Sequence, residues 1–361
     1  MNEAIPGEQH PKNTIRRHKK SRNLSKRRTA KPKKTHHTPR RRSPQRKRSR
    51  SVRDDEEGHL ITQPGDFIRA RYEVIRTLGQ GVFGTVLECT DHERGDIQVA
   101  LKIAKGMDSY RKAARSEARI LAHINLCDPE DQHSCVQMLN WFHFHGHVCI
   151  VFELLGLSTY DFLQENNFYP YPLEQIRHMG WQIFRAVDFL HQSKLIHTDL
   201  KPENILFINS EHSVEYNDKM KRYEKKIKNP DVKIADFGNS VYHNEDHSSE
   251  IQTRHYRAPE VVLGLKWDQS CDVWSLGCIL LEYYLGYVVF MTHDSKEHLA
   301  MMERILGPIP LSIFLQTNED SDHIAFFDLI QKTLEYDSEK RISPSEVLKH
   351  LFFHPLQQTS P

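Results

Sequence analysis

Hydrophobic and polar side chains alternate after residue 66 in the manner of β-strands. Residues 72–78 alternate and lead into a glycine-rich turn at 79–84, while the apolar stretches 99–103 and 148–152 also predict strands. In residues 110–124, apolar side chains recur at three- and four-residue spacing. This spacing predicts a helix with one buried face. The pattern stays globular to about residue 355, which suits one large two-lobed domain or two smaller ones.

The chain before this pattern differs in composition. The first 57 residues have almost no large apolar side chains, so they cannot bury enough surface to offset the entropy of ordering. Residues 1–53 hold 20 Lys and Arg and two acids, about +18, which leaves 50 − 20 = 30 basic and 48 − 2 = 46 acidic residues, about −16, in the remainder. The sequence therefore predicts a disordered basic arm, residues 1–66, attached to an acidic globular body.

The basic clusters of the arm allow several functions. They lie at residues 26–28, 40–44 and 46–51. Dense positive charge can make weak contacts with RNA through phosphates or act as a nuclear address, and a solubilising tail without a partner is the alternative. Serines 43, 49 and 51 follow arginines, so phosphorylation would turn a cationic string into one of alternating charge. Arg-Ser stretches of this kind resemble those of splicing factors.

Cysteine, histidine and hydropathy patterns narrow the class further. The six cysteines show neither CxxC pairing nor a ligand spacing with histidine, so reduced thiols in an intracellular protein are expected. The 23 histidines are scattered, which favours solvated or packed side chains over a metal cluster. No apolar run approaches membrane-spanning length and the N-terminus is too polar for a secretory signal, so we expect no membrane partner.

The glycine-rich turn is suited to phosphate groups. Gly79, Gly81 and Gly84 let a hairpin approach phosphates closely, where a Cβ would clash and backbone N–H groups must face oxygens. Any tight β-turn can use glycines, so the significance of this one depends on Lys102, a cation in an apolar strand. Such a cation needs a counter-charge, and Glu117 on the predicted helix is the candidate. We expect Lys102 to hold α- and β-phosphate oxygens and Glu117 to orient it.

Two further motifs carry the chemistry. The segment HTDLKPEN at residues 197–204 and Asp-Phe-Gly at 236–238 place an acid, a cation and two metal-ligand side chains in the order that phosphoryl transfer from ATP requires. A capped turn that starts a helix is the alternative for the first motif. With the glycine turn before them and Ala-Pro-Glu at 258–260 after them, their order and spacing resemble those of a eukaryotic protein kinase.

Each of these side chains has an expected role. Asp199 would accept or orient the proton of the substrate hydroxyl, and Lys201 would stabilise charge on the moving phosphoryl group. Asn204 and Asp236 would hold Mg²⁺, a hard ion that prefers oxygen ligands. Asp272 is expected to brace the backbone around Asp199. A buried ion pair is expected between residues 260 and 341.

The kinase resemblance implies an α+β fold with two lobes. The small β-rich lobe and hinge would span residues 67–156, the larger helical lobe residues 157–355, and a tail residues 356–361. Phe152 would lie at the back of the adenine pocket, with backbone groups of Glu153 and Leu155 facing adenine. Ser158 and Asp161 sit where ribose hydroxyls would lie, although both also suit a helix start. The expected nucleotide set is Leu78, Gly79, Gln80, Gly81, Gly84, Val86, Ala100, Lys102, Phe152, Glu153, Leu155, Ser158 and Asp161.

Two departures from the usual kinase pattern stand out. Thr198 occupies the place where many kinases have an arginine that receives an activation-loop phosphate, and a threonine cannot make that bidentate contact. We therefore expect that activity does not strictly require loop phosphorylation. Residues 215–230 are polar and highly charged, and predict an inserted exposed hairpin or loop that serves docking or shielding.

One hexapeptide points to a narrower family. Residues 299–304 are Leu-Ala-Met-Met-Glu-Arg, the sequence that names the LAMMER, or Clk-type, dual-specificity kinases. The chain resembles that family over roughly residues 65–355. Physically, the hexapeptide predicts a packed helix with an apolar stripe and no catalytic chemistry, begun by a capping box of Asp294 and Glu297. The chain departs from the family after residue 310, where the segment up to residue 322 is shorter than usual.

The family resemblance implies substrates, cofactors and location. Such kinases use ATP and Mg²⁺ to phosphorylate Arg/Ser-rich splicing factors in the nucleus, with some cytoplasmic protein, and autophosphorylate on Ser, Thr and Tyr. Glu203 could pair with a substrate arginine; Glu245, Asp246 and Glu250 are further candidates, with a solvated loop as the alternative. A monomer is expected. The alternatives are a catalytically silent scaffold and an RNA-associated protein acting through the arm.

Overall fold

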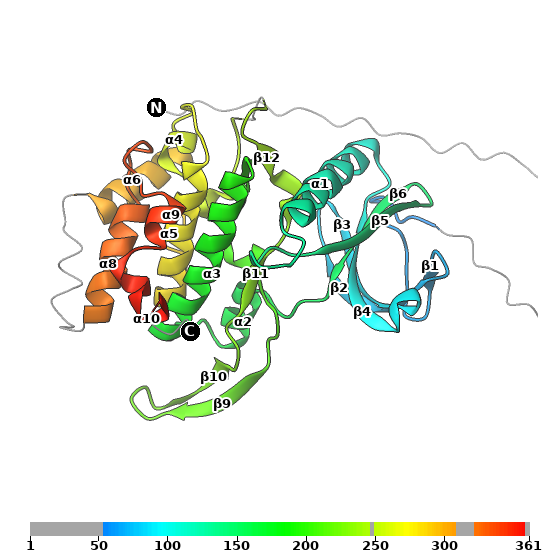
Figure 1. Ribbon diagram of the computed structural model, residues 1–361, viewed down its shortest axis with the longest axis horizontal. Coiled ribbons are helices and arrows are strands. Elements are labelled where there is room, and N and C mark those ends of the chain that lie inside the picture. Colours follow the sequence, from blue (N-terminus) through cyan, green and yellow to red (C-terminus); the bar gives the residue numbers. More distant parts are fainter. Residues whose placement is uncertain (1–52, 246–248, 308–320, 358–361) are drawn as a thin grey trace, which may run out of the picture. The chain divides into compact units, whose positions relative to one another are not determined.

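The computed structural model describes residues 53–245, 249–307 and 321–357 (Figure 1). The predictions for the arm before residue 53, for Asp246 and for most of the short segment after residue 310 therefore concern residues outside the described ones. The described residues form a small β-rich lobe and a larger helical lobe, which confirms the predicted fold class. No helix among them is both long and apolar enough to cross a membrane.

The small lobe is a six-stranded antiparallel sheet in the order β1-β2-β3-β4-β6-β5. Its core consists of the apolar residues that face inward, among them Val74, Leu101 and Val151. Alternation therefore predicts the buried face correctly. The strands are β1 (Phe67–Ile68), β2 (Tyr72–Gln80), β3 (Gly84–Asp91), β4 (Ile97–Ala104), β5 (Met138–Phe144) and β6 (His147–Glu153).

One long helix lies against this sheet. Helix α1 (Asp108–Cys127) contains the predicted segment 110–124 and extends it at both ends. Its buried residues include Ile120, Leu121 and Ile124, the positions that gave the helical period. Glu117 lies on the same buried face, so the packing of apolar neighbours carries a carboxylate into the interior.

The large lobe is built around α5 (Ser270–Leu285), a mostly apolar helix that is buried along most of its length. The other helices are α2 (Thr159–Glu165), α3 (Leu173–Gln192), α4 (Pro259–Val262), α6 (Ser295–Leu306), α8 (Ser321–Thr333), α9 (Pro344–Val347) and α10 (His354–Gln357). Short antiparallel pairs join β8 (Ile205–Phe207) to β11 (Val232–Ile234) and β7 (Leu195–Ile196) to β12 (Val241–Tyr242).

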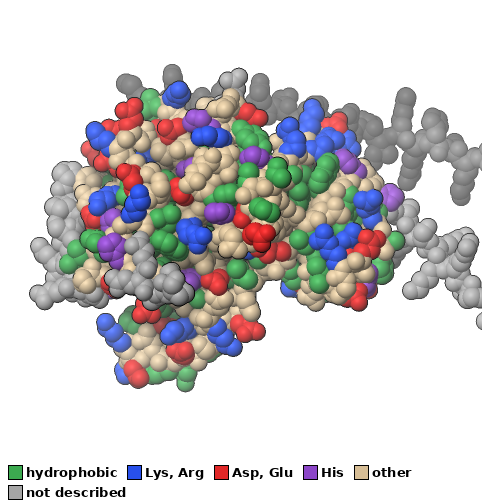
Figure 2. Space-filling model, viewed as in Figure 1, with side chains coloured by type: hydrophobic (Ala, Val, Ile, Leu, Met, Phe, Trp, Pro, Cys, Tyr) green, Lys and Arg blue, Asp and Glu red, His purple; other side chains and the backbone are tan. Residues whose placement is uncertain are grey.

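The inserted segment forms the predicted exposed hairpin. Strands β9 (His212–Asn217) and β10 (Arg222–Ile227) pair with each other and extend from the large lobe (Figure 1). On the face seen in Figure 2, basic and acidic side chains are interspersed over it. Few contacts hold it to the large lobe: Ile227 at its base is buried, and Asn166 bonds the backbone of Lys225 in both directions.

The hexapeptide lies in α6, as predicted. Met302 is fully buried, while Leu299 and Leu306 are partly buried against the same core. Asp294 caps the helix by accepting from two backbone N–H groups, but Glu297 bonds the backbone N–H of residue 293 rather than that of Asp294. Asp294 and Glu297 therefore both cap the first turn of α6, but they do not form the predicted capping box, in which Glu297 would bond the backbone N–H of Asp294.

The structure differs from the expected arm boundary. Residues 53–66 were assigned to the arm, but Leu60 and His59 are buried against the small lobe. The backbone N–H of Gly106 donates to the carbonyl of Gly58 at 2.9 Å, and Asp54 pairs with the buried His147 at 3.0 Å. One leucine and a few polar contacts are too sparse to produce a recognisable hydrophobic period. The packed part of the chain thus begins before residue 67.

Candidate active site

A buried carboxylate, that of Asp272, holds the backbone at the start of the segment 197–200. Asp272, on α5, accepts from the backbone N–H groups of His197 and Thr198, each at 2.9 Å, and from His191 Nε2 at 3.0 Å. Burial alone would raise the pKa of Asp272, but these donors lower it below its usual range. The brace predicted from the sequence is present. It fixes two peptide planes immediately before Asp199.

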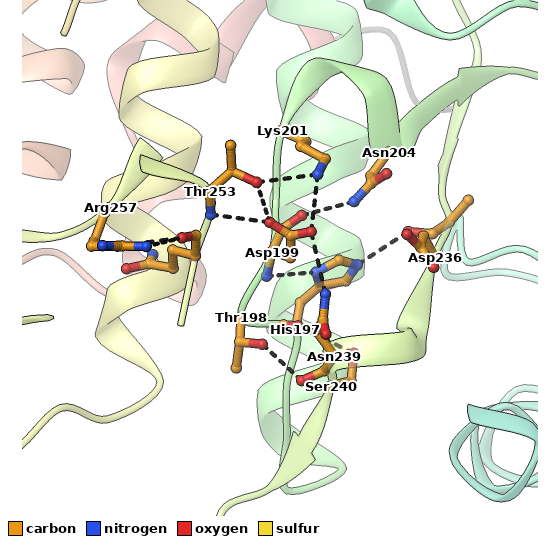
Figure 3. A network of polar contacts seen from close by, with 12 residues as sticks. His197, Thr198, Asp199, Lys201, Asn204, Asp236, Asn239, Ser240, Thr253 and Arg257 are labelled. Atoms are coloured by element: carbon orange, nitrogen blue, oxygen red, sulfur yellow. Dashed lines mark hydrogen bonds and ion pairs between the residues drawn. The ribbon is translucent and has the colours of Figure 1, made fainter. Parts of the chain in front are cut away.

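Asp199 lies at the centre of a polar cluster (Figure 3). Lys201 Nζ lies 3.0 Å from Asp199 Oδ2. Thr253 donates to Asp199 Oδ1 through its hydroxyl at 2.6 Å and through its backbone N–H at 3.1 Å. Lys201 Nζ also reaches the Thr253 hydroxyl at 3.1 Å. Thr253 was not among the predicted site residues, because its contact with Asp199 joins positions 54 apart in the chain.

The two predicted metal ligands are both near this cluster. Asn204 donates through Nδ2 to the backbone carbonyl of Asp199 at 2.9 Å, which leaves its amide oxygen as the atom suited to a cation. Asp236 follows β11 with φ of +59°, a left-handed conformation that is strained for a residue with a side chain. Carboxylate and amide oxygens fit a hard divalent cation such as Mg²⁺.

The predicted ion pair links α1 to β4. Lys102 Nζ lies 2.7 Å from Glu117 Oε1 and 2.9 Å from Asp236 Oδ1, so it also joins the small lobe to the large one. Burial alone would lower the pKa of Lys102, but the carboxylates of Glu117 and Asp236 raise it. Burial would raise the pKa of Asp236, and Lys102 more than reverses this effect. The site therefore holds a charged lysine between two acids.

The sheet register brings the predicted nucleotide residues together. Val86 on β3 faces Lys102 on β4, and Ala100 faces Phe152 on β6. Gly81 N–H donates to the carbonyl of Gly84 at 2.9 Å, which closes the turn after Leu78 and Gln80. A Cβ on Gly84 would lie 2.1 Å from the carbonyl oxygen of Ile103, so packing requires that glycine.

The other two glycines have no such packing reason. A Cβ on Gly79 or Gly81 would meet no protein atom within 4 Å. Glycine there leaves the backbone accessible to an approaching group, which fits a phosphate-binding turn. The neighbouring cavity is lined by Phe83, Lys102, Glu117, Asp236 and other residues.

The hinge residues have contacts of their own. The Glu153 side chain accepts from the backbone N–H of Gln137 at 2.8 Å and from Lys233 Nζ at 2.7 Å, while Leu155 packs against the core. Ser158 caps α2 by accepting from the backbone N–H of Asp161, and its hydroxyl donates to the Asp161 carboxylate at 2.7 Å. The helix-start interpretation of these two residues therefore holds. Their contact with a ribose stays a prediction.

Glu203 is exposed beside the cluster. It lies in a short helical turn (Pro202–Asn204), and partial desolvation together with the carboxylates of Asp199 and Asp161 raises its pKa. Glu260 and Arg341 form the predicted ion pair, with two bonds of 2.8 and 3.0 Å in the interior. Tyr256 is buried and donates to Glu282 at 2.6 Å, so it is a packed tyrosine in this structure.

This fold and this site define a protein kinase. Residues 72–353 match the protein kinase domain family. A crystal structure of a kinase domain aligns with a TM-score of 0.74 and 33% identity, covering 83% of this chain and 100% of that one.

Curated relatives narrow the class. The chain is 53% identical over 351 residues to dual specificity protein kinase CLK4 of Mus musculus, covering 88% of this chain and 73% of the relative. It is 54% identical over 349 residues to CLK1 of Homo sapiens, covering 87% and 72%. Identity to serine/threonine-protein kinase Doa of Drosophila melanogaster is 47% over 345 residues, covering 84% of this chain and 41% of that one. The chain belongs to the protein kinase family and, within it, to the Clk-type (LAMMER) dual-specificity kinases. This membership supports the kinase interpretation over the silent scaffold and the RNA-associated protein.

Proposed function

We propose that this chain transfers the γ-phosphoryl group of Mg-ATP to serine and threonine hydroxyls of arginine- and serine-rich nuclear proteins such as splicing factors, and autophosphorylates on tyrosine as well. The observation that carries the proposal is the position of Asp199, Lys201 and Thr253 in mutual contact at 2.6–3.1 Å. A carboxylate and an ammonium held together in this way can orient a hydroxyl and neutralise the charge that develops during its attack.

The chain's own residues divide the work between binding and proton handling. Lys102, held by Glu117, is placed for phosphate oxygens, and Asn204 and Asp236 would hold Mg²⁺. The magnesium ion, when bound, neutralises charge on the transferred group. Asp199 Oδ2 would accept or orient the proton of the substrate hydroxyl. Lys201 lies next to the same carboxylate and would stabilise negative charge there.

The charge of the body supports an arginine-rich substrate. With residues 1–53 excluded, the chain carries about −16 by the count of 30 basic and 46 acidic residues. An acidic surface attracts cationic peptides and raises their association rate. Glu203 is exposed beside Asp199 and offers a carboxylate for a substrate arginine. We assign the arm to nuclear localisation and recruitment, with weak RNA contact as a further possibility that salt-dependent binding would test.

The first experiment measures radiolabelled phosphate transfer from Mg-ATP to an Arg-Ser repeat peptide, with the wild-type chain and Asp199→Asn side by side. Asn is close to Asp199 in size and shape but is uncharged and replaces one acceptor oxygen with an NH₂ donor, so transfer should fall by about a thousand-fold, the scale of losing a positioned acid–base group together with charge. Thermal unfolding of both proteins is the control. If the wild-type chain labels neither the peptide nor itself, the silent scaffold becomes the leading interpretation.

A further inference from the structure

The activation segment, which runs from Asp-Phe-Gly at 236–238 to Ala-Pro-Glu at 258–260, contains a buried glutamine in a strained conformation. Gln252 has φ of +63° and only 7% of its surface exposed. A residue with a long side chain rarely adopts this left-handed conformation, which costs about 1–3 kcal/mol and persists only where surrounding contacts hold it. The contacts of Gln252 should therefore explain why the strain is kept.

Gln252 bonds three separate parts of the large lobe. Its backbone N–H donates to the carbonyl of Thr198 at 2.9 Å, in the segment that carries Asp199. Its side-chain Nε2 donates to the carbonyl of Cys271 at 2.9 Å and to Ser275 Oγ at 2.8 Å, both on α5. Its Oε1 accepts from the backbone N–H of Ala258 at 2.9 Å, where α4 begins. Both ends of the amide are thus satisfied inside the protein.

Gln252 precedes a residue that bonds Asp199, so its own hydrogen bonds bear on the proposed catalytic residue. The next residue is Thr253, whose hydroxyl and backbone N–H both donate to Asp199. Gln252 and Thr253 share a planar peptide unit. Fixing Gln252 therefore also fixes the orientation of the backbone N–H of Thr253. Loss of the side-chain bonds would release Thr253 from Asp199 without touching the Lys102–Glu117 pair.

The groups that bond the Gln252 side chain are neutral. Thr198, where an arginine would receive a phosphate, instead donates its hydroxyl to the carbonyl of Asn239 at 2.8 Å. Arg257 donates to the carbonyls of Ile251 and Gln252 at 2.9 and 2.8 Å. Desolvation by burial and the neighbouring Arg254 lower the pKa of Arg257. Apart from the guanidinium of Arg257, the described contacts thus hold this part of the segment with amides, hydroxyls and carbonyls.

We propose that Gln252 is a positioning residue that holds Thr253 against Asp199, so that the activation segment keeps its active arrangement without a phosphate. The inference rests on the proposed kinase function and deepens it. Buried neutral hydrogen bonds from one glutamine do here what a phosphate–arginine pair does where an arginine is present. The strain at Gln252 is the cost of aiming its side chain at α5 while its backbone bonds Thr198.

The test uses the full chain made with a coexpressed phosphatase, assayed with Mg-ATP and an Arg-Ser repeat peptide. The wild-type chain should stay active. Gln252→Leu removes the side-chain bonds at similar size, and its kcat should fall by about ten-fold or more, the effect expected from one or two buried hydrogen bonds. The KM for ATP should change less than about two-fold, because the nucleotide residues do not contact Gln252. A purely structural role would not separate kcat from ATP binding in this way.

A matched variant and a double-mutant cycle complete the design. Gln175→Leu also removes a buried glutamine, one that bonds the carbonyl of Ile227 at the base of the hairpin, and should lower stability without changing kcat. Ser275→Ala removes one partner of Gln252, so Ser275→Ala and Gln252→Leu should reduce kcat by less together than the product of their separate effects.

Three results would overturn the proposal: wild-type kcat in Gln252→Leu, an equal loss in Gln175→Leu, or inactivity of the phosphatase-treated wild-type chain that phosphorylation restores. Should Gln252→Leu fail to fold, Ser275→Ala alone decides, and an unchanged kcat there counts against the role of Gln252. A wild-type chain that labels nothing, whatever its phosphorylation state, instead contradicts the proposed function itself.

Discussion

Glu282 and Asp272 are buried carboxylates on the same helix, yet their surroundings push their pKa values in opposite directions. Asp272 accepts from two backbone N–H groups and a histidine, which stabilise its charge. Glu282 accepts, among the residues that the structure describes, only from the hydroxyl of Tyr256, at 2.6 Å. Burial raises the pKa of Glu282 to about 7, the charge of Glu203 adds to the rise, and the bond from Tyr256 opposes it. The number of donors therefore decides which acid stays charged.

This difference predicts how stability depends on pH. The folded pKa of Glu282 lies above the value of about 4.3 expected in the unfolded chain, so the folded state keeps a proton that the unfolded state loses. Between about pH 4.3 and 7 the free energy of unfolding falls, by up to about 4 kcal/mol from this group. Glu282→Gln still accepts from Tyr256 but cannot ionise. Its unfolding midpoint, relative to wild type, should rise steadily from pH 5 to pH 8; a constant difference across that range would argue against a raised pKa.

The residues of the site were predictable to different degrees. Lys102 could be identified from the sequence because a charge in an apolar strand needs a counter-charge. Asp199 and Asp236 could be identified because their motifs follow the order and spacing of a protein kinase. Thr253 and Gln252 could not, because both are neutral and their roles depend on contacts with distant segments. Short-range pattern carries no information about which neutral side chain will meet a carboxylate 54 positions away.

At the scale of elements, the β9–β10 hairpin is an exposed addition fixed to the large lobe by a few contacts. Asn166, at the end of α2, donates to the carbonyl of Lys225 at 3.1 Å and accepts from its backbone N–H at 2.7 Å. Arg222 lies over the ring of Tyr169, 3.5 Å from its centroid. The sequence predicted the insertion from its polarity, but the residues that anchor it, among them Asn166 and Tyr169, lie in other segments of the chain.

Asn166→Ala should lower stability without lowering activity. The substitution leaves the backbone N–H and carbonyl of Lys225 without their side-chain partner in a partly buried place, which costs about 1–3 kcal/mol and lowers the unfolding midpoint by a few degrees. Asn166 bonds the hairpin, whereas Asp199 bonds Lys201 and Thr253, so kcat on the Arg-Ser peptide should stay at the wild-type value.

Asn217→Ala is the control, because Asn217 bonds only within the hairpin and its turn. It should change the midpoint less than Asn166→Ala does. An equal shift in the two variants would mean that the hairpin's own folding, rather than its attachment, limits stability.

At the scale of the whole molecule, strand β11 connects the lobes beside the hinge. Ile234 donates to the carbonyl of Ser134 and accepts from the backbone N–H of Val136, at 2.8 and 2.9 Å. Lys233 forms ion pairs with Asp131 and with Glu153 of the hinge. The strand that delivers Asp236 is thereby tied to the segment expected to face adenine. The two-lobed architecture followed from motif order, whereas this tie depends on tertiary contacts that no local pattern predicts.

The last prediction concerns where the kinase body begins. A chain starting at residue 53 should match the full chain in unfolding midpoint and in kcat on a short Arg-Ser peptide. A chain starting at residue 67 loses Leu60, which is 6% exposed, and the bond between Gly106 and Gly58. It also loses His59, whose Nδ1 lies 3.2 Å from the hydroxyl of Thr85, next to the glycine turn. Burial of a leucine alone contributes about 2 kcal/mol, so the midpoint should fall by about 5 °C or more.

The position of Thr85 adds a kinetic expectation to this thermal one. Because Thr85 follows Gly84 directly, losing the contact with His59 should loosen the turn and raise the KM for ATP. Leu60→Ala in the longer chain separates the two effects: it should lower the midpoint while leaving the KM for ATP unchanged, since the His59 contact remains. If the chain starting at residue 67 were as stable and as active as the one starting at residue 53, residues 53–66 would belong to the arm after all.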